Sequence, residues 1–156
     1  MPNELTIRSF QPEDQTAVKK LILEGLKDHW GTIDPLKNPD LDDIGSYYAR
    51  GFFRVVVLDG RIVGTGALIP RADSAAEIVR MSVARDLRRR GIGSAILKQL
   101  IGDAEASGRR KIILETTSTW SDAVAFYERR GFRPTHVQGG DTYFLLELNR
   151  GSASVV

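Results

Sequence analysis

The sequence of 156 residues has no cysteine and only two histidines, His29 and His136. Without cysteine, the chain cannot form a disulfide, a thiolate nucleophile or a cysteine-ligated zinc site. Two histidines leave little material for a histidine-based metal centre or for a Ser-His-Asp triad. We therefore expect a protein that uses no metal ion and forms no covalent intermediate on a cysteine sulfur.

Long apolar runs and an excess of one charge are lacking as well. No stretch approaches the length of a membrane span, and the first residues, MPNELTIRSF, carry no apolar run typical of a signal peptide. The 22 basic and 20 acidic residues leave a formal net charge of +2, which is too balanced to indicate a nucleic-acid or membrane partner. We expect a cytoplasmic protein that binds neither.

The pattern of apolar residues predicts one domain with a mixed β-sheet. Strands are expected at 5–10, 76–83 and 111–117, with hairpins over 52–70 around Asp59-Gly60 and over 135–148 around Gly139-Gly140. Helices are expected over 12–30, 38–49, 92–104 and 121–130. Asn38 is the expected cap of the second helix, and Pro39 its first residue.

The resulting order is β-α-α-β-β-β-α-β-α-β-β. Its central β-α-β-α portion needs a parallel crossover, whereas the hairpins make the flanks antiparallel, so we expect an α+β fold with helices flanking a mixed sheet. Residues 1–150 are expected to form the single domain. Residues 151–156, GSASVV, show no pattern and are expected to be a loose tail.

The stretch DLRRRGIGSAI, residues 86–96, places three arginines before an expected helix start. Cations at a helix N-terminus are disfavoured by about 0.3–1 kcal/mol each. An anion held between the arginines and the helix would reverse this, because helix N-termini bind anions. Gly91 and Gly93 would let the backbone turn and approach a phosphate closely. The stretch therefore predicts a diphosphate cradle.

The same stretch matches neither of two well-known phosphate-binding motifs. A dinucleotide fingerprint would need glycine or alanine where Ile96 stands, and a Walker A loop would need Gly-Lys, which the chain does not contain. Two alternatives to the cradle stay open. One is a solvated basic turn, partly neutralised by Asp86. The second is a nucleic-acid patch, although few aromatic residues accompany the arginines.

Two motifs in a fixed order carry a family resemblance. The strand 76–83 leads into R-x-x-G-x-G at Arg88–Gly93, and A-x-x-x-Y-x-x-x-G-F follows at Ala123–Phe132. This combination resembles the GNAT superfamily of acyl-CoA-dependent N-acetyltransferases, and the resemblance covers residues 5–148. It implies acetyl-CoA as co-substrate and an amine as acceptor.

The resemblance also implies which residues bind the cofactor. Backbone amides of the R-x-x-G-x-G turn would hold the pyrophosphate of coenzyme A, and the preceding strand would pair with the pantetheine arm. The thioester would then lie between this strand and the strand 111–117. The implied cofactor-binding residues are Met81, Ser82, Val83, Arg88, Arg89, Arg90, Gly91, Ile92, Gly93 and Ser94.

Two residues are candidates for catalysis. Tyr127 stands where the family commonly has a tyrosine near the thioester sulfur, and a phenol with a pKa near ~10 can donate a proton to a thiolate. A core aromatic is the alternative. Glu77 stands where histone-type members have a general base. Neutralising a lysine-like amine at pH 7 costs roughly 4–5 kcal/mol, so Glu77 either takes the proton or only binds the ammonium.

The acceptor site is implied only in outline. In the family, the acceptor enters near the first two helices and the last hairpin, which makes His29 and Trp30 candidate substrate residues. Asp34, Asp40, Asp42 and Asp43 could attract a cationic amine, or could simply favour a helix start. Trp120 stands where many members have an asparagine that contacts the cofactor, and packing is the alternative role.

The expected activity is acetyl transfer from acetyl-CoA to a primary amine of a small molecule or amino acid, by direct attack in a ternary complex. Acetylation of a protein N-terminus or lysine is an alternative, and so is a domain that senses acyl-CoA without turnover. The family resemblance is also compatible with a homodimer.

Overall fold

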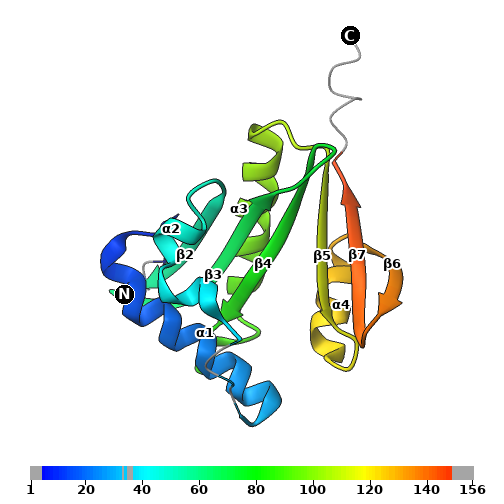
Figure 1. Cartoon of the computed structure of the whole chain (residues 1–156). Coiled ribbons are helices and arrows are strands. Elements are labelled where there is room, and N and C mark those ends of the chain that lie inside the picture. The colour runs from blue at the N-terminus through cyan, green and yellow to red at the C-terminus, as the bar shows by residue number, and fades with distance from the viewer. Residues whose placement is uncertain (1–4, 33, 35–36, 149–156) are drawn as a thin grey trace. The chain divides into compact units, whose positions relative to one another are not determined.

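The computed structural model describes residues 5–32, 34 and 37–148 (Figure 1). Its strands are β1 (Leu5–Ser9), β2 (Phe52–Leu58), β3 (Arg61–Pro70), β4 (Ala75–Val83), β5 (Lys111–Thr117), β6 (Arg133–Gln138) and β7 (Asp141–Glu147). Its α-helices are α1 (Gln15–Trp30), α2 (Ile44–Tyr47), α3 (Ile92–Ala106) and α4 (Ser121–Arg129). The predicted order of elements and the α+β class are confirmed.

Within the described residues the strands form one mixed sheet in the order β1-β2-β3-β4-β5-β7-β6. β4 and β5 pair in parallel, over Ala75–Glu77 and Lys111–Ile113. The β2–β3 and β6–β7 hairpins are antiparallel, as are the β1–β2 and β5–β7 pairs. The parallel crossover thus lies where the sequence predicted it.

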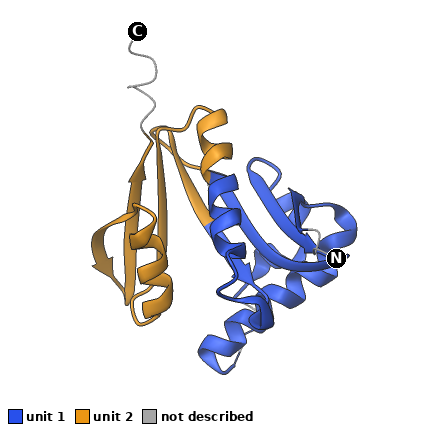
Figure 2. Ribbon diagram, turned by 180° about the vertical axis from the view of Figure 1, so that it is seen from behind, with its two compact units in different colours: residues 1–69, 79–100 blue, residues 70–78, 101–156 orange. Residues whose placement is uncertain are grey.

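The chain divides into two compact units (Figure 2). Unit 1 comprises residues 1–69 and 79–100, and unit 2 comprises residues 70–78 and 101–156. β4 and α3 each begin in one unit and end in the other.

The sheet of unit 1 is covered on both faces. On one face, α1 and α2 enclose a core of Val18, Ile22, Leu41, Ile44, Tyr48, Phe53, Val55 and Ala67. On the other face α3 approaches β3 closely. A Cβ on Gly66 would lie 2.5 Å from a methyl carbon of Ile96, so only glycine allows this helix to pack so near.

In unit 2, α4 packs on one face of the β5–β7 ladder. The ring of Tyr127 lies against the rings of Phe132 and Phe144. Gly131, with a φ of 91°, ends the helix beside Leu146. The opposite face of these strands carries Glu115 and Tyr143, which stand opposite each other in the β5–β7 register.

The segment 38–49 differs from the predicted helix. It forms a 3-10 turn at Pro39–Asp42 and then the single turn of α2. Asn38 makes no capping hydrogen bond, and Asp43 caps α2 by accepting the N–H of Ser46 at 3.2 Å. Asn38 thus occupies the predicted N-cap position and Pro39 opens the turn, but the Asn38 side chain accepts a hydrogen bond from Arg80 in place of a capping one.

Two further expectations concern the C-terminal tail and membrane-spanning segments. The predicted loose tail, residues 151–156, lies outside the described residues. Among the residues that are described, no helix is both long and apolar enough to cross a membrane.

Candidate active site

The arginine-rich stretch forms a tight turn between the end of β4 and the start of α3. Arg89 and Gly91 adopt left-handed backbone conformations, with φ of 65° and 85°. The carbonyl of Gly91 accepts the N–H of Ala95 at 3.0 Å, so Gly91 caps the helix that begins at Ile92. The first N–H groups of a helix lack carbonyl partners within it. This backbone geometry suits an anion.

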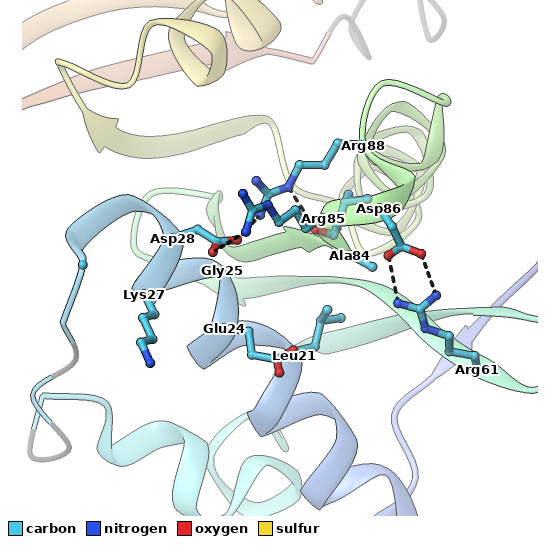
Figure 3. A pocket seen from close by; sticks show the side chains of 12 residues that line it. Leu21, Glu24, Gly25, Lys27, Asp28, Arg61, Ala84, Arg85, Asp86 and Arg88 are labelled. Carbon is cyan, nitrogen blue, oxygen red and sulfur yellow. Dashed lines mark hydrogen bonds and ion pairs between the residues drawn. The ribbon is translucent and has the colours of Figure 1, made fainter.

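A cleft of about 700 Å³ opens beside this turn (Figure 3). It is lined by Leu21, Glu24, Gly25, Lys27, Asp28, Gly31, Arg61, Val83, Ala84, Arg85, Asp86 and Arg88. A Cβ on Gly25 would lie 3.5 Å from Ser82 Oγ and 3.9 Å from Arg88 Nη2. The volume is in the range of small-molecule sites, and two predicted cofactor residues, Val83 and Arg88, line it.

Arg88 is held loosely at the edge of this cleft. Its Nη2 lies 3.5 Å from the carboxylate of Asp28 on α1, and Arg85 Nη1 lies 3.6 Å from the same carboxylate (Figure 3). The Nε of Arg88 donates to the carbonyl of Val83 at 3.3 Å. All three contacts are long for charge-assisted hydrogen bonds, so a tighter anion would compete well for this guanidinium.

Asp86 is bound more firmly, but to a different arginine. Arg61, at the start of β3, donates two hydrogen bonds to its carboxylate, at 2.9 and 3.0 Å (Figure 3). This fork is the main reason why the pKa of Asp86 lies below its ordinary value. The charge of Arg90 also lowers the pKa of Asp86, so this carboxylate acts on the arginine-rich turn as well as on Arg61.

The remaining predicted cofactor residues flank the turn. Met81, Ser82 and Val83 end β4 and are half-buried, and α3 opens with buried Ile92 and half-buried Gly93 and Ser94. Arg89 and Arg90 are exposed. The structure therefore places the predicted cofactor residues on one continuous run of strand, turn and helix within unit 1.

Tyr127 is a buried residue of α4 in unit 2. Its side chain packs edge-on to Phe126 and Phe132, with ring centroids 5.1 and 5.7 Å apart. Burial raises the pKa of its phenol well above the ordinary value, so the hydroxyl keeps its proton at neutral pH. The residue is thus a core aromatic whose protonation state also suits a proton donor.

Glu77, the second predicted catalytic residue, lies on β4 in unit 2. Arg71 donates to its carboxylate from Nε at 2.8 Å, and the Nη2–Oε1 distance of the pair is 2.7 Å. The side chain of Glu77 is 17% exposed, against 47% for Arg71. Arg71 thus holds this carboxylate as an ion-pair partner on the surface of unit 2.

Sequence reasoning missed the neighbours of Glu77. Glu77 stands opposite Ile113 in the parallel register, and Glu115 follows two residues later on the same face of β5. Tyr143 stands opposite Glu115, and Asp141 precedes it by two residues. The only signal in the sequence was the charge of Glu115 directly after the apolar residues 112–114.

Glu115, a carboxylate of this face, has a pKa that is raised above its ordinary value. Although Glu115 is exposed, partial desolvation of its carboxylate is the first cause of the raised pKa, and the charges of Asp141 and Glu77 add to it. The hydroxyl of Tyr143 hydrogen-bonds to Glu115, and the ring of His136 stacks on Tyr143 at 4.4 Å. This part of unit 2 can therefore bind a cation and accept a proton.

The residues predicted to bind the acceptor differ in their exposure and in their contacts. His29 and Trp30 end α1 and are exposed, and neither lines the cleft. Asp42 pairs with Lys19, whereas Asp40 is buried against Arg80. Asp34 is exposed, and Asp43 caps α2. Trp120 occupies the position before α4 but makes no capping hydrogen bond with its side chain.

Comparison with known proteins now identifies the class. Residues 17–132 match the "Acetyltransferase (GNAT) family". The chain therefore belongs to the GNAT family of acetyltransferases, as its motifs suggested.

Individual relatives agree with this class. The chain is 34% identical over 110 residues to human N-acetylaspartate synthetase, a match that covers 68% of this chain and 36% of that enzyme. The chain spans at most about half the length of the first curated relatives it matches.

Solved structures show the same fold. An acetyltransferase of the GNAT family from Staphylococcus aureus Mu50 matches with a TM-score of 0.86 at 23% identity, over 94% of this chain and 100% of that one. The PaiA N-acetyltransferase of Thermoplasma acidophilum, solved in complex with coenzyme A, matches with a TM-score of 0.82 at 18% identity, over 93% and 99%.

Proposed function

We propose that this protein transfers an acetyl group from acetyl-CoA to a primary amine of a small molecule or amino acid, by direct attack in a ternary complex. The observation that carries the proposal is the left-handed turn Arg89–Gly91, which opens α3 beside a cleft that contains a loosely held Arg88. This combination suits a diphosphate, and the bound coenzyme A of the PaiA structure supports the choice of ligand.

The proposed reaction forms one bond and breaks one. The neutral amine nitrogen attacks the thioester carbonyl, a C–N bond forms, and the C–S bond breaks as coenzyme A leaves. The amine loses a proton, and the leaving thiolate gains one. Tyr127, whose pKa is raised by burial, donates to the thiolate in this scheme. The chain mainly supplies positioning and proton transfer.

The carboxylates of Glu77, Glu115 and Asp141 define our proposal for the acceptor. They attract an ammonium group and repel a second carboxylate. The raised pKa of Glu115 suits a group that takes a proton from the amine. The relative named N-acetylaspartate synthetase suggests an amino acid acceptor. We nevertheless expect basic or neutral amines to be preferred over aspartate here.

Ligand-dependent thermal unfolding tests the binding half of the proposal. Acetyl-CoA at 100 times its dissociation constant should stabilise the protein by about 2.7 kcal/mol. ATP and NAD at the same concentration are the controls. An equal shift with every anion would reduce Arg88–Arg90 to a basic turn and would contradict the proposal.

Release of coenzyme A across a panel of amines, including aspartate, tests the transfer half. The thiol assay has no protein background because the chain has no cysteine. Tyr127→Phe should lower kcat by a factor of about 10²–10⁴ while acetyl-CoA still stabilises the protein. Unchanged turnover in this variant would exclude the proton-donor role, and binding without release for any amine would favour a sensor.

A further inference from the structure

β4 contains a residue in an unusual backbone conformation. Arg80 has a φ of 56°, in the left-handed region that a non-glycine residue within a strand rarely adopts. Such a conformation costs of order 1–3 kcal/mol and persists only where the surroundings hold it. Its presence in the strand that precedes the arginine-rich turn raises the question of what holds it and what it achieves.

The left-handed residue shifts the alternation of side chains along β4. Val79 packs against the core beneath α1 and α2, and the side chain of Arg80 reaches Asp40 on the same face. Met81 points the other way, with Sδ 2.9 Å from the position of a Cβ on Gly66, on the α3 face. Two consecutive residues therefore share a face, as in a β-bulge, and every later side chain is shifted by one position.

A set of buried and partly buried polar contacts holds this bulge, and we call it the Arg80 clamp. Arg80 donates from Nε and Nη2 to the two carboxylate oxygens of Asp40, at 2.9 and 2.7 Å, and from Nη2 to Asn38 at 3.0 Å. Tyr48 donates its hydroxyl to Asp40 at 2.5 Å. The carbonyl of Arg80 accepts the hydroxyl of Thr65, which is fully buried, at 2.7 Å.

A buried ion pair such as the one in the Arg80 clamp contributes little net stability to a core. Asp40 and Tyr48 are each only 7% exposed, and well-packed apolar residues often stabilise such a site as well as a buried ion pair does. A buried pair of this kind is better suited to selecting one arrangement among several. Here it selects the shifted register, which directs Ser82 towards Gly25 on α1 and Met81 towards α3.

We propose that Arg80 is a positioning residue, whose clamp to Asn38, Asp40 and Tyr48 keeps β4 in the bulged register in which Met81–Val83 present their backbone to acyl-CoA. The proposal rests on the proposed function of Met81–Val83. It also makes residues 38–48 a structural support of the cofactor strand, although they are 30 or more residues away in the sequence. A slip of the strand by one residue would exchange its two faces.

Two mild variants test the clamp in the full-length chain. Tyr48→Phe removes one hydroxyl and keeps the ring, and Asp40→Asn keeps the shape but removes the charge. Tyr47→Phe is the control for the first, because Tyr47 is adjacent and 62% exposed. Asp14→Asn is the control for the second, because Asp14 is buried and receives a fork from Arg8 at 2.7 and 3.0 Å, on β1.

Activity is measured at a temperature where every variant is fully folded by circular dichroism. Because small misplacements of reacting groups are costly, we expect kcat at saturating acetyl-CoA to fall by about tenfold or more in Tyr48→Phe and Asp40→Asn. Tyr47→Phe and Asp14→Asn should keep the wild-type kcat, even though Asp14→Asn unfolds at a lower temperature. If Tyr48→Phe keeps both kcat and KM within about twofold, the clamp only stabilises the fold and the proposal is wrong.

Hydrogen exchange separates this proposal from the proposed function. In Tyr48→Phe, amides of residues 79–83 should exchange about tenfold faster or more than in the wild type, while those of β2 are unchanged. This readout does not depend on activity. Failure of the wild type to bind acetyl-CoA would contradict the proposed function alone. Exchange in residues 79–83 that matches the wild type, or that rises equally throughout unit 1, would overturn the clamp.

Discussion

Two arginines on and just beyond β4 make opposite use of the same chemistry. Arg80 is mostly buried, with a side chain that is 19% exposed, and its guanidinium makes short contacts to Asp40 and Asn38, with distances of 2.7–3.0 Å. Arg88, eight residues later, also faces a carboxylate, but its distance to Asp28 is 3.5 Å and its side chain is 39% exposed. The first arginine is fully engaged within the chain, whereas the second is only loosely engaged.

The difference shows how one residue type serves two purposes. A buried, bidentate pair has little remaining capacity to bind a ligand, and removing one partner strands a charge. An exposed pair at long distance contributes little to stability, so its arginine can change partners at small cost. These contacts suit Arg80 to the structural role that we propose for it in β4, and Arg88 to the proposed binding of the cofactor.

Replacement of Arg80 should give the largest effect on stability. Arg80→Met leaves Asp40 buried without its cation, and this should lower the free energy of unfolding by about 3–5 kcal/mol. Arg88→Met should change it by no more than about 1 kcal/mol, because the pair with Asp28 is exposed. Urea unfolding of both variants measures the comparison directly. Equal losses would show that burial does not distinguish the two arginines.

For the binding of acetyl-CoA, in contrast to stability, we expect replacement of Arg88 to have the larger effect. Arg88→Ala removes a charge-assisted contact worth about 1.5–3 kcal/mol, so KM for acetyl-CoA should rise by roughly 10- to 100-fold. The kcat at saturation should stay near the wild-type value if Arg88 binds the ground state and the transition state equally.

Lys98→Ala is the matched control for Arg88→Ala, because Lys98 is an exposed cation on α3, the helix that follows the arginine-rich turn. An equal rise of KM in both variants would mean that only the overall positive charge attracts the cofactor. Arg88 would then have no specific role in binding acetyl-CoA.

The environment of Arg88 could be predicted from the sequence, whereas that of Arg80 could not. The turn at Arg88–Gly91 could be predicted, because glycines and arginines before a helical pattern have a local physical meaning. The Asp59-Gly60 hairpin could be predicted for the same reason, and its residues have φ of 51° and 81°.

The clamp could not be predicted from local pattern. In AEIVRMSV, Arg80 occupies an ordinary strand position, and no neighbouring residue signals a left-handed backbone. Its partners stand about 40 residues earlier, where Pro39 and the acidic residues favoured a helix start. Glu115 was missed for a related reason, because its neighbours depend on the pairing of β5 with β4 and β7.

The pH dependence of stability should separate a carboxylate of the clamp from one on the open sheet face. Burial alone would raise the pKa of Asp40, but hydrogen bonds from Arg80 and Tyr48 outweigh it, and the pKa lies below the ordinary value. Its stabilising contribution is therefore present above about pH 4 and is lost as pH falls through the native pKa. Asp40→Asn should be destabilising at pH 7 and much less so in acid.

The contribution of Glu115 to stability should depend on pH in the opposite direction to that of Asp40. Its native pKa is raised, mainly by partial desolvation of its carboxylate, so the neutral form is favoured in the folded state. That contribution is complete below the unfolded pKa of about 4.3 and is lost as pH rises through the native value. Glu115→Gln should therefore stabilise the protein at pH 7 and have little effect near pH 4. Parallel pH profiles for the two variants would contradict the assigned environments.

The smallest expected effect tests whether Asp28 restrains Arg88. Asp28 lies on α1, and its contacts to Arg85 and Arg88 at 3.6 and 3.5 Å are contacts that an incoming diphosphate would have to replace. An exposed pair of this kind is worth about 0.2–1 kcal/mol. Asp28→Asn should therefore tighten acetyl-CoA binding by a factor of about 1.5–5 without changing stability measurably.

Calorimetric titration at low and high salt gives the decisive form of this measurement. The gain in affinity should shrink as salt screens the exposed charges. In the double variant with Arg88→Ala, most of the gain should disappear, because the carboxylate then has lost its main partner at the cleft. A loss of affinity in Asp28→Asn would show instead that Asp28 orients Arg88 for the cofactor, and Arg88 would then resemble Arg80 more closely than the distances suggest.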